Sequence, residues 1–172
     1  FNNFVSGYVR ISSEDEIVAF ERYFDNDRIA ALNGIPVGGN VPSPMHLYLP
    51  QFTAFEGSET FLNLIHSGTM NARVSLSLKD NQGNDLAKGV NLRLAPSESI
   101  RINLVDLFGL TDPGNALTGW LLLESDIPGV VGDGEIHSFS GRAMTTVPLQ
   151  GSLTRRSVFS HVAQGSGIST GL

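Results

Sequence analysis

The feature that most constrains this chain is a regular alternation of apolar and polar residues along short segments. Residues 8–11, 73–79 and 99–104 all show it, and in the second of these a serine separates Val74 from Leu76. Successive side chains of a β-strand point to opposite faces of its sheet, so this pattern predicts strands with one buried face and one exposed face. Such half-buried strands are typical of antiparallel sheets.

Turn-forming residues separate these segments at short intervals. The chain contains 19 glycines and 8 prolines and has no long amphipathic helix pattern; residues 104–110 predict a single helical turn. Short strands separated in this way predict an all-β protein, an antiparallel β-sandwich of immunoglobulin-like or jelly-roll-like type. Turns are predicted at residues 25–27, 37–40, 80–85, 95–97, 112–115 and 132–134.

The composition argues against several classes of function. The 172 residues are 41% hydrophobic and 16% charged, which favours a folded core over disorder. A net charge of −6 argues against binding nucleic acid through phosphates, and the doublet Arg155-Arg156 is interpreted as a solvated connector. The absence of cysteine excludes disulfides, thiolate metal sites and cysteine nucleophiles. No apolar run reaches the roughly 18 residues of a membrane span, and no signal peptide is present, so any export signal is expected outside this segment.

Three pairs of segments indicate an internal repeat. Residues 7–20 (GYVRISSEDEIVAF) resemble residues 119–132 (GWLLLESDIPGVVG): each has a glycine, an aromatic residue, alternating apolar residues and a serine followed by an acidic residue. The other two pairs are residues 33–39 with 145–151, and residues 49–62 with 159–172. Counted from their first residues, the three pairs are offset by 112, 112 and 110 positions. Three pairs in one order at nearly one offset predict a tandem array.

The repeat predicts how the chain is divided. Residues 1–46 are expected to be the C-terminal part of one β-sandwich repeat, residues 47–152 a complete repeat, and residues 153–172 a connector with the first strand of the next repeat. The two outer parts would be incomplete sandwiches with unpaired strand edges. They are therefore expected to pair with adjacent repeats or with another copy of the chain.

These segments also resemble a repeat family of large uncharacterised bacterial extracellular proteins. In that family a Phe-Pro-x-Phe opening, a Gly-rich stretch and a Gly-Trp-x-x-Val strand follow one another; here Leu49 replaces the opening Phe, and the Gly-rich stretch is reduced to Glu56-Gly57-Ser58. The resemblance implies immunoglobulin-like modules of cell-surface proteins in an extracellular or cell-surface location, and it implies no catalytic residues. It rests on LYLPQFTAFEGSETFLNLIHSG (47–68), ARVSLSLKDNQGNDL (72–86), LRLAPSESIRINL (92–104) and GWLLLESDIPGVVG (119–132).

Residues 75–94 predict a hairpin whose tip, residues 80–85 (DNQGND), is rich in oxygen-bearing side chains. A calcium loop of the EF-hand type needs glycine at its sixth position and glutamate at its twelfth; counted from Asp80, the glycine is fourth and the twelfth residue is not glutamate. Asn, Asp and Gly are also the residues that a tight turn needs. The tip is therefore predicted to be a turn.

No residues form a recognisable catalytic or metal-binding motif. The four histidines are far apart and are interpreted as separate strand or loop residues: His46, His66, His137 and His161. Residues 165–169 (GSGIS) have the wrong order for a nucleophile elbow, and Glu14-Asp15-Glu16 is interpreted as a solvated turn. The sequence therefore predicts no catalytic residue, no metal, no cofactor and no enzyme.

Tyr8 and Trp120 remain as candidate ligand or assembly residues, because they occupy matching positions in the first repeat pair. Each is opposite in alternation to apolar neighbours, Val9 and Ile11 in one case and Leu121 and Leu123 in the other. If those neighbours face the core, both rings face outward. There they could form a second packed face, a contact between repeats, or a platform for a sugar ring.

We therefore expect a structural function, an extracellular β-sandwich repeat that builds a surface fibre, filament, stalk or adhesin. Its expected partners are copies of itself or adjacent repeats, joined by strand pairing, and surface polysaccharide; nucleic acid and a membrane span in this segment are not expected. The alternative is a carbohydrate- or protein-binding accessory module of a secreted protein. A fibre subunit should contact identical neighbours, whereas a binding module should be monomeric with an exposed aromatic platform.

Overall fold

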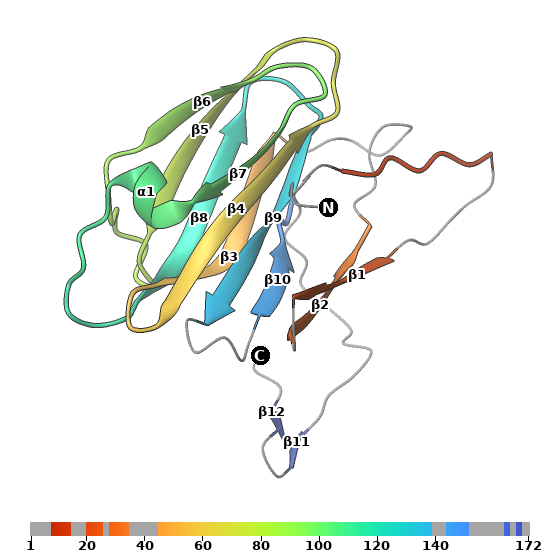
Figure 1. Cartoon of the computed structure of the whole chain (residues 1–172). Coiled ribbons are helices and arrows are strands. Elements are labelled where there is room, and N and C mark those ends of the chain that lie inside the picture. The colour runs from red at the N-terminus through yellow and green to blue at the C-terminus, as the bar shows by residue number, and fades with distance from the viewer. Residues whose placement is uncertain are drawn as a thin grey trace, which may run out of the picture.

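Two four-stranded antiparallel sheets form the main body of the protein (Figure 1). A computed structural model describes residues 8–14, 20–25, 28–34, 45–138, 144–151, 164–165 and 168–169. One sheet has the order β3-β8-β5-β6, with β3 at His46–Ala54, β8 at Leu117–Ser125, β5 at Ala72–Lys79 and β6 at Val90–Leu94. The other has the order β10-β9-β4-β7, with β10 at Met144–Pro148, β9 at Val130–Ser138, β4 at Ser58–His66 and β7 at Ser99–Asn103.

The predicted alternation of apolar and polar residues places one face of each main strand in the hydrophobic core. In β5, Val74, Leu76 and Leu78 are at most 1% exposed, while the residues between them are partly exposed. Fully burying a leucine contributes roughly 1.5–3 kcal/mol, so a shared leucine-rich cluster holds the two sheets together. The prediction of an all-β, antiparallel fold is confirmed. The cluster contains Leu49, Phe52, Leu76, Leu78, Leu121 and Leu123 from one sheet and Leu62, Leu64 and Val130 from the other.

The helical turn predicted at residues 104–110 is confirmed as α1, Leu104–Phe108. Asn103 caps it, because its side chain accepts a hydrogen bond from the backbone N–H of Val105 at 2.9 Å. Gly109 ends it in the left-handed region, with a φ of 60°. Leu104 is buried in the core cluster, which anchors α1 beside β7 and β4.

A tight corner carries the chain from β3 in the first sheet to β4 in the second. Phe55, Glu56 and Gly57 all have positive φ, at 66°, 44° and 84°. Behind the corner, the buried Thr60 hydroxyl donates a hydrogen bond to the carbonyl of Thr53 at 2.8 Å and accepts one from its N–H at 3.0 Å. The hydroxyl therefore joins the two strands at the point where they diverge into different sheets.

After β10 the chain returns to the edge of the first sheet. The backbone of Leu149 donates to the carbonyl of Gly132 at 2.9 Å, and its side chain is buried. Gln150 then exchanges two backbone hydrogen bonds of 2.8 Å with Tyr48 of β3. This segment ties the two sheets together along the side formed by β3 and β10.

The turn predicted at residues 132–134 is wrong, because these residues lie in the middle of β9. A Cβ on Gly132 would lie 2.0 Å from the backbone oxygen of Asn63, and a Cβ on Gly134 would lie 2.6 Å from Leu49. The two glycines therefore let the neighbouring strands β4 and β3 approach β9 closely, and they do not reverse the direction of the backbone. The turns predicted at 80–85, 95–97 and 112–115 do lie between strands, and residues 37–40 lie outside the described residues.

Two short hairpins lie outside the main sheets. β1 (Phe20–Asp25) pairs with β2 (Arg28–Asn33), and β2 lies beside β10 (Figure 1). The turn predicted at 25–27 falls mainly on residues 26 and 27, which lie outside the described residues. β11 (Gln164–Gly165) pairs with β12 (Ile168–Ser169).

The strand predicted at residues 8–11 is wrong, since residues 8–13 have no regular structure. Val9 is 86% exposed and Ile11 is 61% exposed. Alternation makes a segment suitable for a strand, but a strand forms only where a sheet edge and an apolar face are available to cover it.

Candidate functional site

The polar tip of the β5–β6 hairpin is a turn closed by its own side chains, as predicted. The Asp80 carboxylate accepts hydrogen bonds from the backbone N–H groups of Gln82 and Asn84 at 2.9 and 2.8 Å, and from the Asn84 amide at 2.9 Å. The Asn84 amide, assisted by these backbone groups, holds the pKa of Asp80 below its ordinary value. Lys79 forms a salt bridge of 2.7 Å with Asp85 across the base of the tip. These bonds account for the oxygen-rich composition of the loop.

Trp120 lies on the outward face of the first sheet, as its alternation predicts. Its neighbours Leu121 and Leu123 are fully buried, and the indole is partly exposed. The ring lies beside Tyr48 of β3, with ring centroids 6.2 Å apart and planes inclined by 42°. The sequence analysis missed Tyr48, although its position between Leu47 and Leu49 carried the same signal.

Tyr8 does not share this setting. It is 38% exposed and precedes residues that lie outside every strand, so it is not on the face of a sheet. The match between the Tyr8 and Trp120 positions is therefore not reproduced in local structure. The structure brings Trp120 together with Tyr48 instead.

The three described histidines lie in three different environments, and His161 lies outside the described residues. His46 is exposed and contacts Glu124 at 3.0 Å. His66 is fully buried, and its Nε2 lies 2.6 Å from the carbonyl of Met70, which fixes the turn between β4 and β5. His137 contacts Glu135 on the outward face of the second sheet. Within the described ranges, no group of three His, Asp or Glu side chains could hold a metal ion.

A polar cluster around Glu135 covers the outward face of the second sheet. Glu135 is only 9% exposed, and it accepts hydrogen bonds from His137 and, at 3.2 Å, from Arg101. The Arg101 guanidinium also lies over the Phe61 ring, 3.6 Å from its centroid. This cluster was not predicted, because residues 132–134 have the composition of a turn. Read as a strand, residues 133, 135 and 137 are polar at alternate positions, a signal that could have found it.

The electrostatics of this cluster are those of a closed ion-pair network. Burial by itself would raise the pKa of Glu135, but hydrogen bonds from His137 and Arg101 and the charges of these groups outweigh it, so the pKa lies below its ordinary value. An ionised carboxylate held between two donors stabilises the face of the sheet. It has no proton to donate to a substrate at neutral pH.

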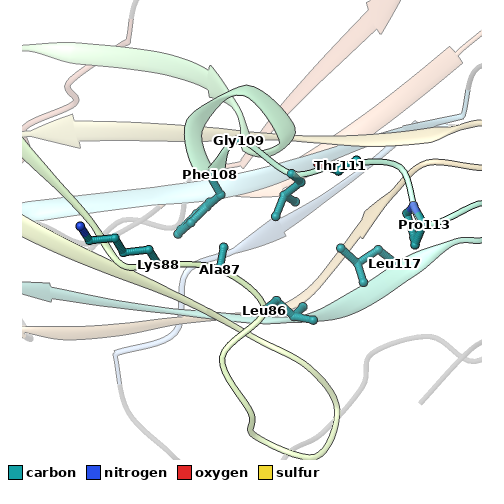
Figure 2. Close-up of a pocket in the computed structure, with 9 residues that line it drawn as sticks. Leu86, Ala87, Lys88, Phe108, Gly109, Thr111, Pro113 and Leu117 are labelled. Carbon is teal, nitrogen blue, oxygen red and sulfur yellow. The ribbon is translucent and has the colours of Figure 1, made fainter.

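An open pocket with a mixed polar and apolar lining lies at the end of the sheets where α1 ends (Figure 2). It has a volume of about 480 Å³. Leu86, Phe108, Leu110 and Leu117 line it, and all four also pack against the core cluster. Figure 2 shows Lys88 on one side of the pocket and Pro113 on the other. The lining combines apolar side chains with the exposed Lys88, and the sequence did not predict that these residues come together.

The remaining sequence-based site predictions concern single segments. Glu14 is exposed, and its neighbours Asp15 and Glu16 lie outside the described residues, as do Arg155 and Arg156. No helix in the described part of the chain is long and apolar enough to cross a membrane.

Comparison with known proteins gives a distant likeness of fold. No family model matches the chain, and no curated protein matches its sequence. Among solved structures it is similar to the crystal structure of Thermotoga maritima 1070, with a TM-score of 0.53 and 14% sequence identity. The match covers 64% of this chain and 96% of that chain. At this identity the likeness concerns the fold alone and supports the antiparallel β architecture.

Proposed function

We propose that this protein is made of tandem β-sandwich units and has a structural role, as a building block of an extracellular fibre, stalk or adhesin. The observation that carries the proposal is that the pairing of β11 with β12 reproduces, at the offset of the sequence repeat, the pairing that joins β3 to β4. The shared leucine core supports the sandwich, since each four-stranded sheet contributes its buried face to it.

The pairing that joins β3 to β4 corresponds to the pairing of β11 with β12. Phe55 pairs with Ser58 in the first, and Gly165 pairs with Ile168 in the second. Both members of the pair are displaced by 110 positions, the offset at which residues 49–62 match residues 159–172. Residues 153–172 are accordingly proposed to contain the opening strand of a further unit.

The β1–β2 hairpin corresponds to β9–β10 through its first strand alone. Asp25 closes the first hairpin by pairing with Arg28, and His137 closes the second by pairing with Met144. Asp25 and His137 are 112 positions apart, the offset of the first repeat pair, whereas Arg28 and Met144 are 116 positions apart. Because β2 also lies beside β10, we propose that closing hairpins of successive units pack side by side.

The experiment that tests this role is sedimentation velocity of the whole chain over a wide concentration range, with electron microscopy of the same samples. A fibre unit should associate with itself into linear oligomers as the concentration rises. A chain that stays monomeric at every concentration would contradict the proposal. The extracellular location is part of the proposal and is tested by fractionating the producing cells.

The Tyr48–Trp120 pair favours a second candidate function, binding of a carbohydrate. Two partly exposed rings side by side on a sheet can stack on the apolar face of a sugar. A panel of surface polysaccharides, titrated against the wild type and the Trp120→Ala variant, tests it. Saturable binding by a monomeric wild type that the variant loses would favour this function over the fibre.

A further inference from the structure

Two arginines lie opposite each other on the outward face of the first sheet. Arg73 of β5 and Arg93 of β6 are direct partners in the antiparallel register, and both are exposed. Their neighbours Ala72, Val74 and Leu94 are buried, so the two arginine side chains project from the opposite, outward face. Like charges directly opposite each other destabilise a pair of strands. The arrangement therefore costs stability in the free protein, and a bound anion would relieve it.

The described part of the chain supplies no counter-charge for these arginines. Lys79, on the same face of β5, forms a salt bridge of 2.7 Å with Asp85, whereas neither Arg73 nor Arg93 forms one with any described residue. A charged residue on the edge strand β6 helps to keep that edge from pairing with other chains. This role does not account for Arg73, because β5 is an interior strand that lies between β8 and β6.

Two carboxylates near Arg73 are bonded on its other side. Asp126, which follows β8, accepts a hydrogen bond from the backbone N–H of Arg73 at 2.7 Å, and Glu124 of β8 lies 3.0 Å from Nε2 of His46 of β3. Because the sheet order is β3-β8-β5-β6, both carboxylates lie toward β8 and β3. β5 and β6 themselves contain no acidic residue, so the side of Arg73 that faces Arg93 is open to an anion.

Polar side chains continue from the arginines along the same two strands. Ser75 of β5 is the direct partner of Asn91 of β6, two residues from the arginine pair and on the same face. An open hollow of about 400 Å³ is lined by Arg73, Ser75 and Asn91, and by the two carboxylates on its β8 side. The guanidinium, hydroxyl and amide groups of this strip can donate hydrogen bonds to carboxylate oxygens and to sugar hydroxyls.

The aromatic pair lies farther along the same face. Trp120 is the direct partner of Lys79, which is six residues from Arg73 in β5. At about 3.3 Å per residue, roughly 20 Å of strand separates the rings from the arginine pair. A single sugar cannot reach both places, whereas a polymer that lies lengthwise along β5 and β8 can.

We infer that this outward face binds a polysaccharide that carries carboxylate groups, with a carboxylate held between Arg73 and Arg93 and sugar rings stacked on Trp120 and Tyr48. The inference rests on the second candidate function, carbohydrate binding, and names its ligand class. The planar guanidinium group matches the geometry of a carboxylate and stays charged at every physiological pH. Two such groups therefore select an acidic chain over a neutral one.

The test titrates the whole chain with polygalacturonate and with its fully methyl-esterified form, which has the same backbone without the charge. The wild type should bind the acid roughly tenfold or more tightly than the ester, because the charge-assisted hydrogen bonds are lost with the charge. Arg73→Gln/Arg93→Gln should bind both forms with similar, weak affinity. The matched control, Arg10→Gln/Lys88→Gln, removes two exposed positive charges elsewhere and should bind within about twofold of the wild type.

The comparison of the two polymers on the wild type does not depend on any variant folding. Equal affinity for acid and ester overturns this inference, and it leaves carbohydrate binding standing if Trp120→Ala weakens both. Equal losses in the two double variants also overturn it, because net charge alone would then account for the preference. Binding of neither polymer overturns the inference as well, while the panel of other polysaccharides decides the second candidate function separately.

Discussion

Two pairs of glutamate and histidine lie on the outward faces of the two sheets and differ in burial. In the first sheet, the side chains of His46 and Glu124 are 59% and 48% exposed; in the second, those of His137 and Glu135 are 14% and 12% exposed. Water screens the exposed pair, whereas the buried pair interacts in a medium of lower dielectric constant and has Arg101 as a further partner. The same two residue types therefore stabilise the fold to different extents.

We predict that Glu135→Gln lowers the free energy of unfolding by about 1–3 kcal/mol at pH 7, because it removes the charge that Arg101 and His137 share. The matched control, Glu124→Gln, should change it by less than about 0.5 kcal/mol. Urea unfolding followed by circular dichroism measures both. Equal effects of the two substitutions would refute the assigned role of burial.

The same variant has a predictable pH dependence. The pKa of Glu135 lies below its ordinary value of 4.5 in the folded protein, so its contribution is complete above that value and is lost as the pH falls through the folded pKa. The stability difference between the wild type and Glu135→Gln should therefore shrink as the pH falls below 4.5. A difference that grows as the pH falls below 4.5 would mean that the carboxylate charge is not its source.

At the hairpin tip, we predict that the double variant Asp80→Asn/Asp85→Asn keeps nearly the wild-type melting temperature in both calcium and a chelator. The amide oxygen introduced by Asp80→Asn can still accept backbone bonds of the kind that Asp80 accepts from Gln82 and Asn84. Thermal melts of both proteins in the two buffers measure this. A calcium-dependent rise in the melting temperature that only the wild type shows would identify a metal site and contradict the turn.

At the scale of elements, β3 and β4 are neighbours in the sequence but belong to different sheets. β3 and β4 are separated by a three-residue corner, yet β3 pairs with β8 and β4 pairs with β7 and β9. The corner holds because Thr60 satisfies both backbone groups of Thr53 from a fully buried position. One hydroxyl thus keeps two strands together where their sheets separate.

We predict that Thr60→Val lowers the free energy of unfolding by about 1–3 kcal/mol, because valine fills the same space but leaves the N–H and carbonyl of Thr53 without their partner. Thr118→Val is the control: this threonine is exposed, and its hydroxyl accepts a single bond of 3.3 Å from Asn81. Its effect should stay within about 0.5 kcal/mol. Denaturant titration of the wild type and both variants measures these changes in the free energy of unfolding. Equal decreases in the two variants would mean that the Thr60 hydroxyl does not stabilise the corner between β3 and β4.

At the scale of the whole molecule, the two sheets share one core, so they should unfold together. The chain has a single tryptophan, Trp120 in the first sheet, and its fluorescence reports on that sheet alone. We predict that urea unfolding followed by this fluorescence and by far-ultraviolet circular dichroism, which reports on both sheets, gives the same midpoint. Two separate midpoints would show that the sheets are independent.

Which residues of the main sheets alternate between a buried and an exposed face could be predicted from local sequence patterns. Val74, Leu76 and Leu78 alternate because a strand has a period of two, and residues 80–85 turn because Asp and Gly make that reversal at low cost. The single helical turn after Asn103 followed from the same local rules. These features depend on contacts within a few residues, and a sequence pattern records them directly.

Which strands are neighbours, and which side chains come together on their outward faces, depends on long-range packing. Glu135 accepts a hydrogen bond from Arg101, which is 34 positions away in the sequence. The Tyr48 ring lies beside the Trp120 ring, and Leu86 and Leu117 line the same pocket. Residues 8–11 have the pattern of a strand and form none, whereas residues 132–134 have the pattern of a turn and lie inside a strand. The physical reason is that alternation fixes the side of a segment that must be buried, while the partner that buries it is chosen by long-range packing into one common core.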